Sequence, residues 1–202
     1  AWAEEEGLVA GALFHGNAPA TRAATMTYLW KLAGQPEAGT APFSDVPADA
    51  WYAEAVNTLA SLGMFTGYPD GTFHPNSTIT RAEFAAAALS FADMAPSARC
   101  SFPDVSAQDW FYPYVASAAE YGWIGGYTNG NFGPNDQITR AQVTTIVNNM
   151  LGRAADRDYV IDHQADLVQF SDLTRAHWGY FQIMEATNAH NYTKSNGTES
   201  WR

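Results

Sequence analysis

One arginine recurs three times in the same local sequence. Arg22, Arg81 and Arg140 each follow a threonine and precede an alanine, and they are spaced 59 residues apart. The threonine suits a helix N-cap, but a positive charge in the first helical turn is mildly unfavourable against the helix dipole. Helix stability therefore does not explain the arginine, whereas its guanidinium can form paired hydrogen bonds with a carboxylate.

Two roles for these arginines stay open from the residues alone. Each could pair with an acidic residue of a neighbouring copy, for which Asp45, Asp104 and Asp172 are the candidates. Each could instead lie in a groove between copies and bind a carboxylate of a ligand. We favour the ligand role, and the two roles are compatible if an aspartate pairs with the arginine when the groove is empty.

The arginines belong to a repeat that organises the chain. The second copy (43–92) and the third copy (102–151) align without a gap at the same 59-residue offset. The first copy (1–34) matches only the latter half of this unit, and the C-terminal half copy (170–186) matches only the former half. The predicted segments are 1–38, 39–101, 102–160 and 161–202, and the last could complete the first.

Each complete copy predicts a helix, a loop and a second helix. Gly63 is placed to end the first helix in a left-handed conformation, and a turn-rich loop follows it. Thr80 with Glu83, and Thr139 with Gln142, predict capping boxes. The fold class is mainly α, with short extended segments in the loops. Three second helices could form a central bundle within a pseudo-threefold, three-lobed arrangement, and the insertion at 152–169 is expected to be a loop.

Other repeated residues lie near the predicted grooves. Trp51, Trp110 and Trp178 each stand six residues after one of the aspartates. They could pack in the core or stack on a sugar ring, and both roles stay open. The aspartates are candidates for helix capping or for orienting the arginines, more than for ligand contact. Gly67 and Gly126 are best explained by turn geometry, although their backbone N–H groups could donate to a sugar.

Composition excludes several functions. A formal net charge of −11 argues against nucleic-acid binding, and no apolar run is long enough to insert into a membrane. The single cysteine excludes an intrachain disulfide. The five histidines show no metal-ligand spacing, so no metal or cofactor is expected. No nucleophile–base pair stands out, which argues against an enzyme.

The repeated motifs resemble the S-layer homology (SLH) domain family. The resemblance rests on "F-x-D-V…W", on "G-x-x-x-G-Y-x-[DN]-G-x-F-x-P" and on "I-T-R-A-[EQ]". It implies a pseudo-trimer that holds exported proteins on the cell wall without a covalent bond. Its implied partner is a secondary cell-wall polysaccharide, often carrying a pyruvate ketal, or modified peptidoglycan, and its arginine is implied in binding that polymer.

The resemblance also implies an extracellular, cell-wall location, and any signal peptide would lie outside this sequence. The first copy lacks the loop tyrosine and the Asp-Gly turn, so we expect its groove to be altered and Arg22 to depend on the far end of the chain. The alternative function is a structural or protein-interaction module of a surface layer, with self-association and with degenerate or no glycan binding.

Overall fold

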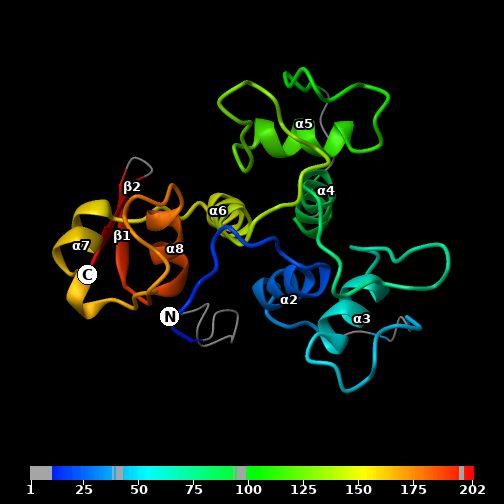
Figure 1. The fold of residues 1–202 in the computed structure, drawn as a ribbon, viewed down its shortest axis with the longest axis horizontal. Coiled ribbons are helices and arrows are strands. Elements are labelled where there is room, and N and C mark those ends of the chain that lie inside the picture. Colours follow the sequence, from blue (N-terminus) through cyan, green and yellow to red (C-terminus); the bar gives the residue numbers. More distant parts are fainter. Residues whose placement is uncertain (1–10, 38, 40–42, 93, 95–98, 196–197) are drawn as a thin grey trace. The chain divides into compact units, whose positions relative to one another are not determined.

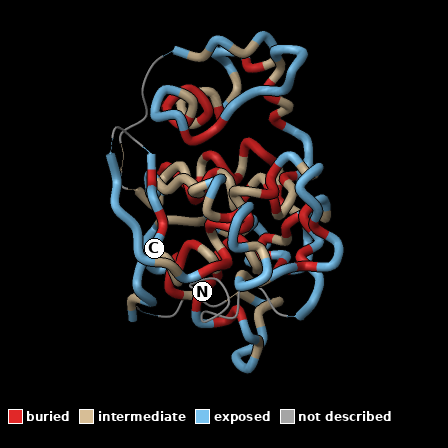
Figure 2. The backbone as a smooth tube through the Cα atoms, turned by 90° about the vertical axis from the view of Figure 1, so that its left-hand side faces the viewer, coloured by how far each residue is buried: buried red, intermediate tan, exposed pale blue. Residues whose placement is uncertain are grey.

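The computed structural model describes residues 11–37, 39, 43–92, 94, 99–195 and 198–202 (Figure 1). The regular secondary structure of these residues is mainly helical, as the sequence predicts, with one small sheet. The chain divides into two compact units. One unit is Pro19–Ile138, and the other combines the residues up to Ala18 with Thr139–Arg202. Buried positions gather along the helices, and the connecting loops are largely exposed (Figure 2).

The unit Pro19–Ile138 contains two packed helix pairs. Helix α2 (Arg22–Leu32) packs against α3 (Ala53–Ser61), and α4 (Arg81–Phe91) packs against α5 (Tyr112–Glu120). Each pair joins the second helix of one copy to the first helix of the next. The packed pair therefore crosses the boundary of the sequence repeat.

The helix ends follow the predicted local signals. Thr80 and Glu83 form a capping box at α4, and Thr139 and Gln142 form one at α6. Thr21 caps α2 by accepting a hydrogen bond from the Ala24 N–H, but the reciprocal bond is missing because residue 24 has no polar side chain. After α3, Gly63 has a φ of 70°, a left-handed conformation that glycine adopts without a steric penalty.

Equivalent residues of three copies are joined by a closed ring of backbone hydrogen bonds. The Ala20 N–H donates to Ile138 O at 2.8 Å, the Ile138 N–H to Ile79 O at 3.0 Å, and the Ile79 N–H to Ala20 O at 3.2 Å. The ring satisfies one donor and one acceptor of each residue, and both isoleucines are fully buried. The three loop ends are thus held together just before the helices that carry the arginines.

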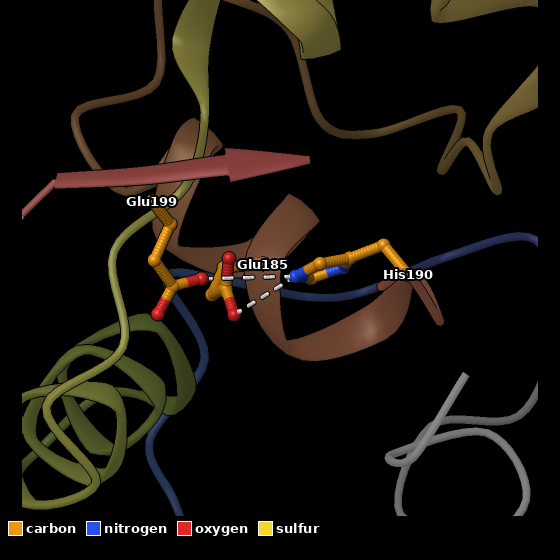
Figure 3. A group of neighbouring side chains, drawn as sticks. All are labelled: Glu185, His190 and Glu199. Atoms are coloured by element: carbon orange, nitrogen blue, oxygen red, sulfur yellow. Dashed lines mark ion pairs between the residues drawn. The ribbon is translucent and has the colours of Figure 1, made fainter. Parts of the chain in front are cut away.

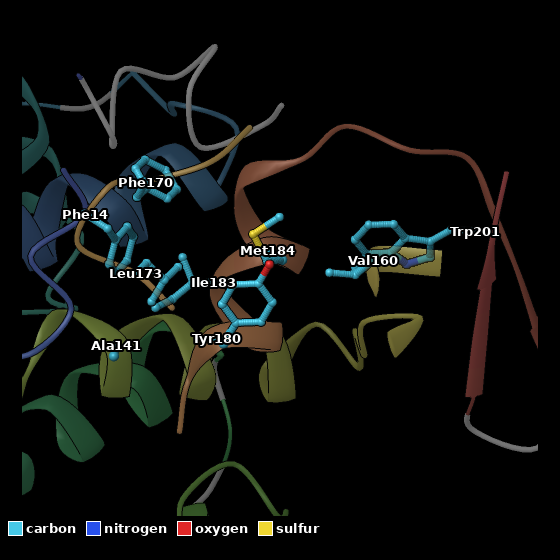
Figure 4. Packing of buried hydrophobic residues seen from close by; sticks show 9 residues of the cluster. All are labelled: Phe14, Ala141, Val160, Phe170, Leu173, Tyr180, Ile183, Met184 and Trp201. Carbon is cyan, nitrogen blue, oxygen red and sulfur yellow. The ribbon is translucent and has the colours of Figure 1, made fainter. Parts of the chain in front are cut away.

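The other unit contains α6 (Arg140–Met150), α7 (Arg157–Asp162), the 3-10 turn η1 (Gln164–Asp166) and α8 (Tyr180–Thr187). Helix α6 packs against α8, and α7 also contacts α8. The prediction of a loop at 152–169 is wrong, because α7 and η1 lie within it. Asp156 caps α7, and Val160 of this helix is buried with Trp201 in the apolar core shown in Figure 4.

The N-terminal loop packs in the same unit as the C-terminal half copy. The Ser171 N–H donates to Ala12 O at 2.8 Å, and the Ala141 N–H donates to Gly16 O at 3.0 Å. The rings of Phe14 and Phe170 lie 5.4 Å apart in the core (Figure 4). These two segments of one chain, far apart in sequence, therefore share one apolar core.

A short antiparallel hairpin follows α8. Strand β1 (Tyr192–Ser195) pairs with β2 (Thr198–Trp201), with Tyr192 opposite Trp201 and Ser195 opposite Thr198. Only two residues, Asn and Gly in the sequence, separate the paired ends, and Asn-Gly is a strong hairpin signal. Across the described part of the chain, none of the helices has the length and apolar character needed to cross a bilayer.

Candidate functional site

Each repeated arginine joins its own copy to the loop of another copy. The Arg22 Nε–H donates to Phe73 O at 2.9 Å and the Arg81 Nε–H to Phe132 O at 2.8 Å. The Arg140 Nε–H donates to Phe14 O at 2.9 Å. The partner is thus a carbonyl of the equivalent loop phenylalanine in each case. Contact with a neighbouring copy was one of the two roles left open by the sequence, but the partner expected there was an aspartate.

The guanidinium groups of Arg22 and Arg81 are buried among aromatic rings. The Arg22 guanidinium lies 4.6 Å from the Phe65 ring centre and 4.9 Å from that of Tyr68. That of Arg81 lies 4.5 Å from Phe132, and its Nη2 donates to Gly125 O at 2.8 Å. Burial lowers the pKa of both arginines below the ordinary value. Cation–π contacts and carbonyl acceptors compensate for the water that each charge has lost.

The incomplete first copy affects a different arginine from the one expected. Arg22 contacts Phe65, Tyr68 and Phe73, which all belong to the intact second copy. It is Arg140 whose guanidinium lies over Phe14, a residue of the first copy. The expectation that Arg22 depends on the far end of the chain is therefore wrong, because each arginine reaches forward by one copy.

The three aspartates hold the loops closed by accepting pairs of backbone N–H groups. Asp45 accepts from Phe73 and His74, each at 2.7 Å. The other two aspartates form the same pair of bonds, Asp104 with Phe132 and Gly133, and Asp172 with Phe14 and His15. Burial alone would raise the pKa of each aspartate, but these hydrogen bonds outweigh it and hold the pKa below its usual value. This role was missed in the sequence, where helix capping or arginine contact was expected.

The repeated tryptophans are exposed. The exposed fraction is 68% for Trp51, 60% for Trp110 and 59% for Trp178. Each packs one edge or face on the adjacent aromatic residue, as Trp110 does on Phe111 at 5.5 Å between ring centres. Core packing is therefore not their role. Three large indoles left in water at equivalent positions have surface available for a ligand.

Gly67 and Gly126 both lie so close to neighbouring atoms that a side chain would not fit. A Cβ at Gly67 would overlap the Phe43 ring and lie 2.6 Å from Thr72 O. A Cβ at Gly126 would lie 2.8 Å from both Asn131 O and the Phe102 ring. The interpretation as turn geometry accounts for both positions, and Gly67 also lines the groove described next.

A groove of about 450 Å³ lies within the unit Pro19–Ile138 and takes residues from three copies. The first copy contributes Arg22, the second contributes the loop after α3 and one side of α4, and the third contributes Trp110 and Tyr114. The lining residues are Arg22, Gly63, Met64, Phe65, Thr66, Gly67, Tyr68, Glu83, Ala86, Ala87, Ser90, Trp110 and Tyr114. Aromatic faces beside a few polar groups form the kind of surface that binds sugar rings.

A second cluster of polar residues lies between α8 and the C-terminal hairpin, to which β2 contributes one member. Figure 3 shows Glu185 of α8, His190 and Glu199 of β2 converging. The atoms of these three side chains that could bind a metal ion lie within 4.8 Å of one another. Arg153 also contacts all three: it is 2.6 Å from Glu185 and 3.1 Å from Glu199, and its Nη2 donates to His190 Nε2 at 2.8 Å. The histidines did not suggest this cluster in the sequence, because its members have no regular spacing.

Arg153 is the cation that this cluster already contains. Since an arginine can only donate, His190 Nε2 accepts, and the ring proton lies on Nδ1, which donates to Asn188 O at 2.8 Å. A metal ion at this position would have to displace the guanidinium. Burial and the nearby carboxylate of Glu199 together raise the pKa of Glu185 to about 7, although the charge of Arg153 acts to lower it.

Comparison with known proteins identifies the repeat. Residues 42–85 and 101–144 match the S-layer homology domain. The chain is 30% identical over 201 residues to a cellulosome-anchoring protein of Acetivibrio thermocellus, covering 94% of this chain and 43% of that protein. It is also 30% identical over 187 residues to cell surface glycoprotein 1 of the same organism, covering 85% of this chain and 8% of that protein. The chain thus spans less than half the length of these relatives.

Proposed function

Because the chain belongs to the S-layer homology domain family, we propose that it attaches an exported protein non-covalently to the bacterial cell wall. Its ligand would be a secondary cell-wall polysaccharide bound in grooves between the copies. The observation that carries this proposal is the groove in which Arg22, Tyr68 and Trp110 come together from three copies. One buried cation and several exposed aromatic faces suit a polar ring with apolar faces better than they suit a protein surface.

The names of the relatives support the general role. They include the cellulosome-anchoring protein and the surface-layer 125 kDa protein of Lysinibacillus sphaericus, which is 29% identical over 166 residues, or 80% of this chain and 13% of that protein. The printed names of the surface-layer protein and of cell surface glycoprotein 1 agree with the extracellular location predicted from the sequence. An endoglucanase of Bacillus sp. strain KSM-635 matches 52% of this chain but only 11% of its own length. A short match of this kind suits a binding module joined to a separate enzyme.

We assign the ligand-binding residues by position in the repeat. Arg22, Gly67 and Trp110 line the groove and are the primary candidates. Equivalent positions of the other copies are proposed to serve equivalent grooves; they are Arg81, Arg140, Trp51, Trp178 and Gly126. The aspartates Asp45, Asp104 and Asp172 hold the loops that form the groove walls.

The pseudo-threefold arrangement belongs to the same proposal. Its support is the hydrogen-bond ring of Ala20, Ile79 and Ile138, which joins equivalent residues cyclically. The terminal segments 1–38 and 161–202 would supply the remaining unit, and the contact of Asp172 with the Phe14 and His15 N–H groups supports closure within one chain.

The test is sedimentation of the purified chain with isolated bacterial wall sacculi. We expect saturable binding to intact sacculi, and loss of that binding when the secondary polysaccharide has been stripped by acid. Binding that survives stripping would point to peptidoglycan as the ligand. Absence of wall binding together with binding to a surface-layer protein would instead favour the structural module, which the incomplete loop of the first copy motivates.

A further inference from the structure

The cluster between α8 and the C-terminal hairpin brings three acceptor atoms together (Figure 3). Glu185 Oε1 lies 3.5 Å from His190 Nε2, and Glu199 Oε2 lies 3.8 Å from the same nitrogen. That nitrogen carries no proton, because Arg153, which hydrogen-bonds to it, can only donate. The imidazole therefore donates to neither glutamate. One nitrogen and two oxygen atoms whose lone pairs converge in this way suit a cation.

The charge of this cluster is incompletely compensated. The side chains of Glu185, His190 and Glu199 are 1%, 4% and 0% exposed, so water hardly reaches them. When both glutamates are ionised, two negative charges face the single positive charge of Arg153. Glu185 Oε2 and Glu199 Oε2 are also buried, and no described residue donates a hydrogen bond to either. Because a buried charge is costly unless it is paired, a divalent cation suits the cluster better than one guanidinium does.

The spacing of the three acceptor atoms favours zinc. Zinc bonds to nitrogen and oxygen are about 2.0–2.1 Å long, so neighbouring ligand atoms of a tetrahedral site lie about 3.3–3.4 Å apart. The separations of 3.5 and 3.8 Å at His190 Nε2 are close to this value. Calcium instead takes roughly six to eight oxygen ligands, and magnesium retains several of its water molecules. An imidazole nitrogen beside two carboxylates therefore favours zinc over either of these ions.

The imidazole is held in the orientation that a metal ion requires. His190 Nδ1–H donates to Asn188 O at 2.8 Å, and the ring stacks on that of Trp201 with 3.6 Å between ring centres. A backbone carbonyl that accepts from one ring nitrogen leaves the lone pair of the other free for a metal, as in most metal-binding histidines. Glu199 is oriented from a third side, because its Oε1 accepts from the Ala154 N–H at 3.4 Å.

The guanidinium of Arg153 stands where the ion would lie, and it has an alternative position. Its Nη2 lies 2.6 Å from Glu185 Oε1 and 2.8 Å from His190 Nε2, so one cationic nitrogen already lies between two of the acceptor atoms. The side chain is 28% exposed, and the guanidinium lies 4.3 Å from the ring centre of the exposed Tyr192. A small rotation toward this ring would keep a cation–π contact and return the charge to water.

We propose that Glu185, His190 and Glu199 bind one zinc ion, which takes the place of the nearby guanidinium and links α8 to the C-terminal hairpin. A water molecule would complete the four ligands. The site goes beyond wall anchoring and does not depend on it, because none of its residues lines the groove of Arg22 and Trp110.

The first experiment is a calorimetric titration of the whole, chelator-treated chain with zinc chloride at pH 7.5. We expect one zinc ion per chain, and no binding of calcium chloride under the same conditions. His190→Gln should weaken zinc binding at least about tenfold, since loss of an outer hydrogen-bond partner alone costs that much at metal sites. The matched control is His163→Gln, which changes an exposed histidine of the same unit and should bind zinc like the unmodified chain.

A second variant separates a metal site from a purely structural ion pair. Arg153→Met removes the competing cation, so zinc should bind about tenfold more tightly or better, because no charged hydrogen bond has to be broken first. The melting temperature of this variant should fall without metal and recover when zinc is added. Arg175→Met, which changes an exposed arginine of the same unit, should alter neither property.

The outcomes decide the proposal in either direction. It is overturned if the unmodified chain binds no stoichiometric zinc, or if binding survives both His190→Gln and Glu199→Gln, which remove different ligands. Glu199→Gln also serves as the comparison if His190→Gln melts too low to be studied. Zinc affinity that is unchanged or lower in a folded Arg153→Met overturns the exchange of guanidinium for metal. A variant that folds only when zinc is present supports it.

Discussion

At the scale of single residues, the repeated arginines connect the copies, and the aspartates hold the loops closed. The arginine of one copy donates to a loop carbonyl of another, and an aspartate accepts two N–H groups from the same loop. Arg81 is 6% exposed and donates to both Phe132 O and Gly125 O. Replacing it with alanine would leave the carbonyl of the buried Phe132 without its donor, so lost wall binding in that variant would not separate recognition from folding.

The first prediction concerns Asp104, the aspartate that holds the loop of the third copy closed. Asp104→Asn should lower the free energy of unfolding by about 1–3 kcal/mol, because an amide accepts on one side only and directs an NH₂ group at the second N–H. Urea denaturation measures the change. The exposed Asp49→Asn is the matched control and should change stability by less than about 0.5 kcal/mol. Equal effects of the two substitutions would contradict the assigned role.

The same aspartates predict sensitivity to acid. The pKa of Asp45, Asp104 and Asp172 is lower in the folded chain than the usual value near 4. Their stabilisation is therefore fully present above about pH 4 and is lost as pH falls through the lower folded values. Stability measured by urea between pH 5 and 2 should fall, and Asp104→Asn should reduce the slope. An unchanged slope in that variant would contradict the prediction.

At the scale of elements, the helices and their caps were predictable because their signals are local. The capping boxes at Thr80 and Thr139 and the left-handed Gly63 depend on residues within one turn. The pairing of α2 with α3 was not predictable, because these helices belong to different copies and no local sequence signal says which helices pack together. Helix α7 was missed because it is one and a half turns long and is stabilised by the cap of Asp156 and by tertiary packing.

The cluster under the hairpin predicts a second dependence on pH. The folded pKa of Glu185 is raised to about 7 from 4.5, so its contribution is present below about pH 4.5 and is lost as pH rises through 7. Glu185→Gln should abolish this loss and stabilise the chain at pH 8, by an amount on the order of 3 kcal/mol if the whole shift is expressed. His190 acts in the opposite direction, because burial lowers its pKa and protonation in acid opposes folding.

Hydrogen exchange tests this prediction locally. Protection factors of the β1 and β2 amides, corrected for intrinsic exchange, should be lower at pH 8 than at pH 6 in the unmodified chain. In Glu185→Gln the difference should disappear. Matching pH dependence in both proteins would show that Glu185 does not control the hairpin.

At the scale of the whole molecule, the 59-residue offset predicted the repeated unit, the helix caps and the candidate residues. It could not predict that each arginine serves the next loop, because Arg22 and Phe73 are 51 residues apart and nothing local links them. It also left the tryptophans undecided between core and surface, since an indole packs well in either place. The structure decides between them: Trp110 contacts the rings of Phe111 and Tyr114 and is still 60% exposed.

Closure of the terminal segments within one chain makes a prediction about assembly. Phe14 is 3% exposed and packs in the core with Phe170. Phe14→Ala should therefore destabilise the chain by about 3–5 kcal/mol, as loss of a core phenylalanine does.

Closure within one chain also predicts that unfolding of the unmodified chain is independent of protein concentration. A transition midpoint that rises with concentration would indicate closure between chains.

The most direct test of wall anchoring through the groove is sedimentation with intact sacculi for two variants. Trp110→Ala removes an exposed groove wall, and Tyr121→Ala removes another exposed aromatic side chain, 39% exposed against 60% for Trp110, that lies outside the groove lining. We predict that Trp110→Ala weakens wall binding about tenfold or more, while Tyr121→Ala binds like the unmodified chain. Equal binding of Trp110→Ala and the unmodified chain would contradict the account.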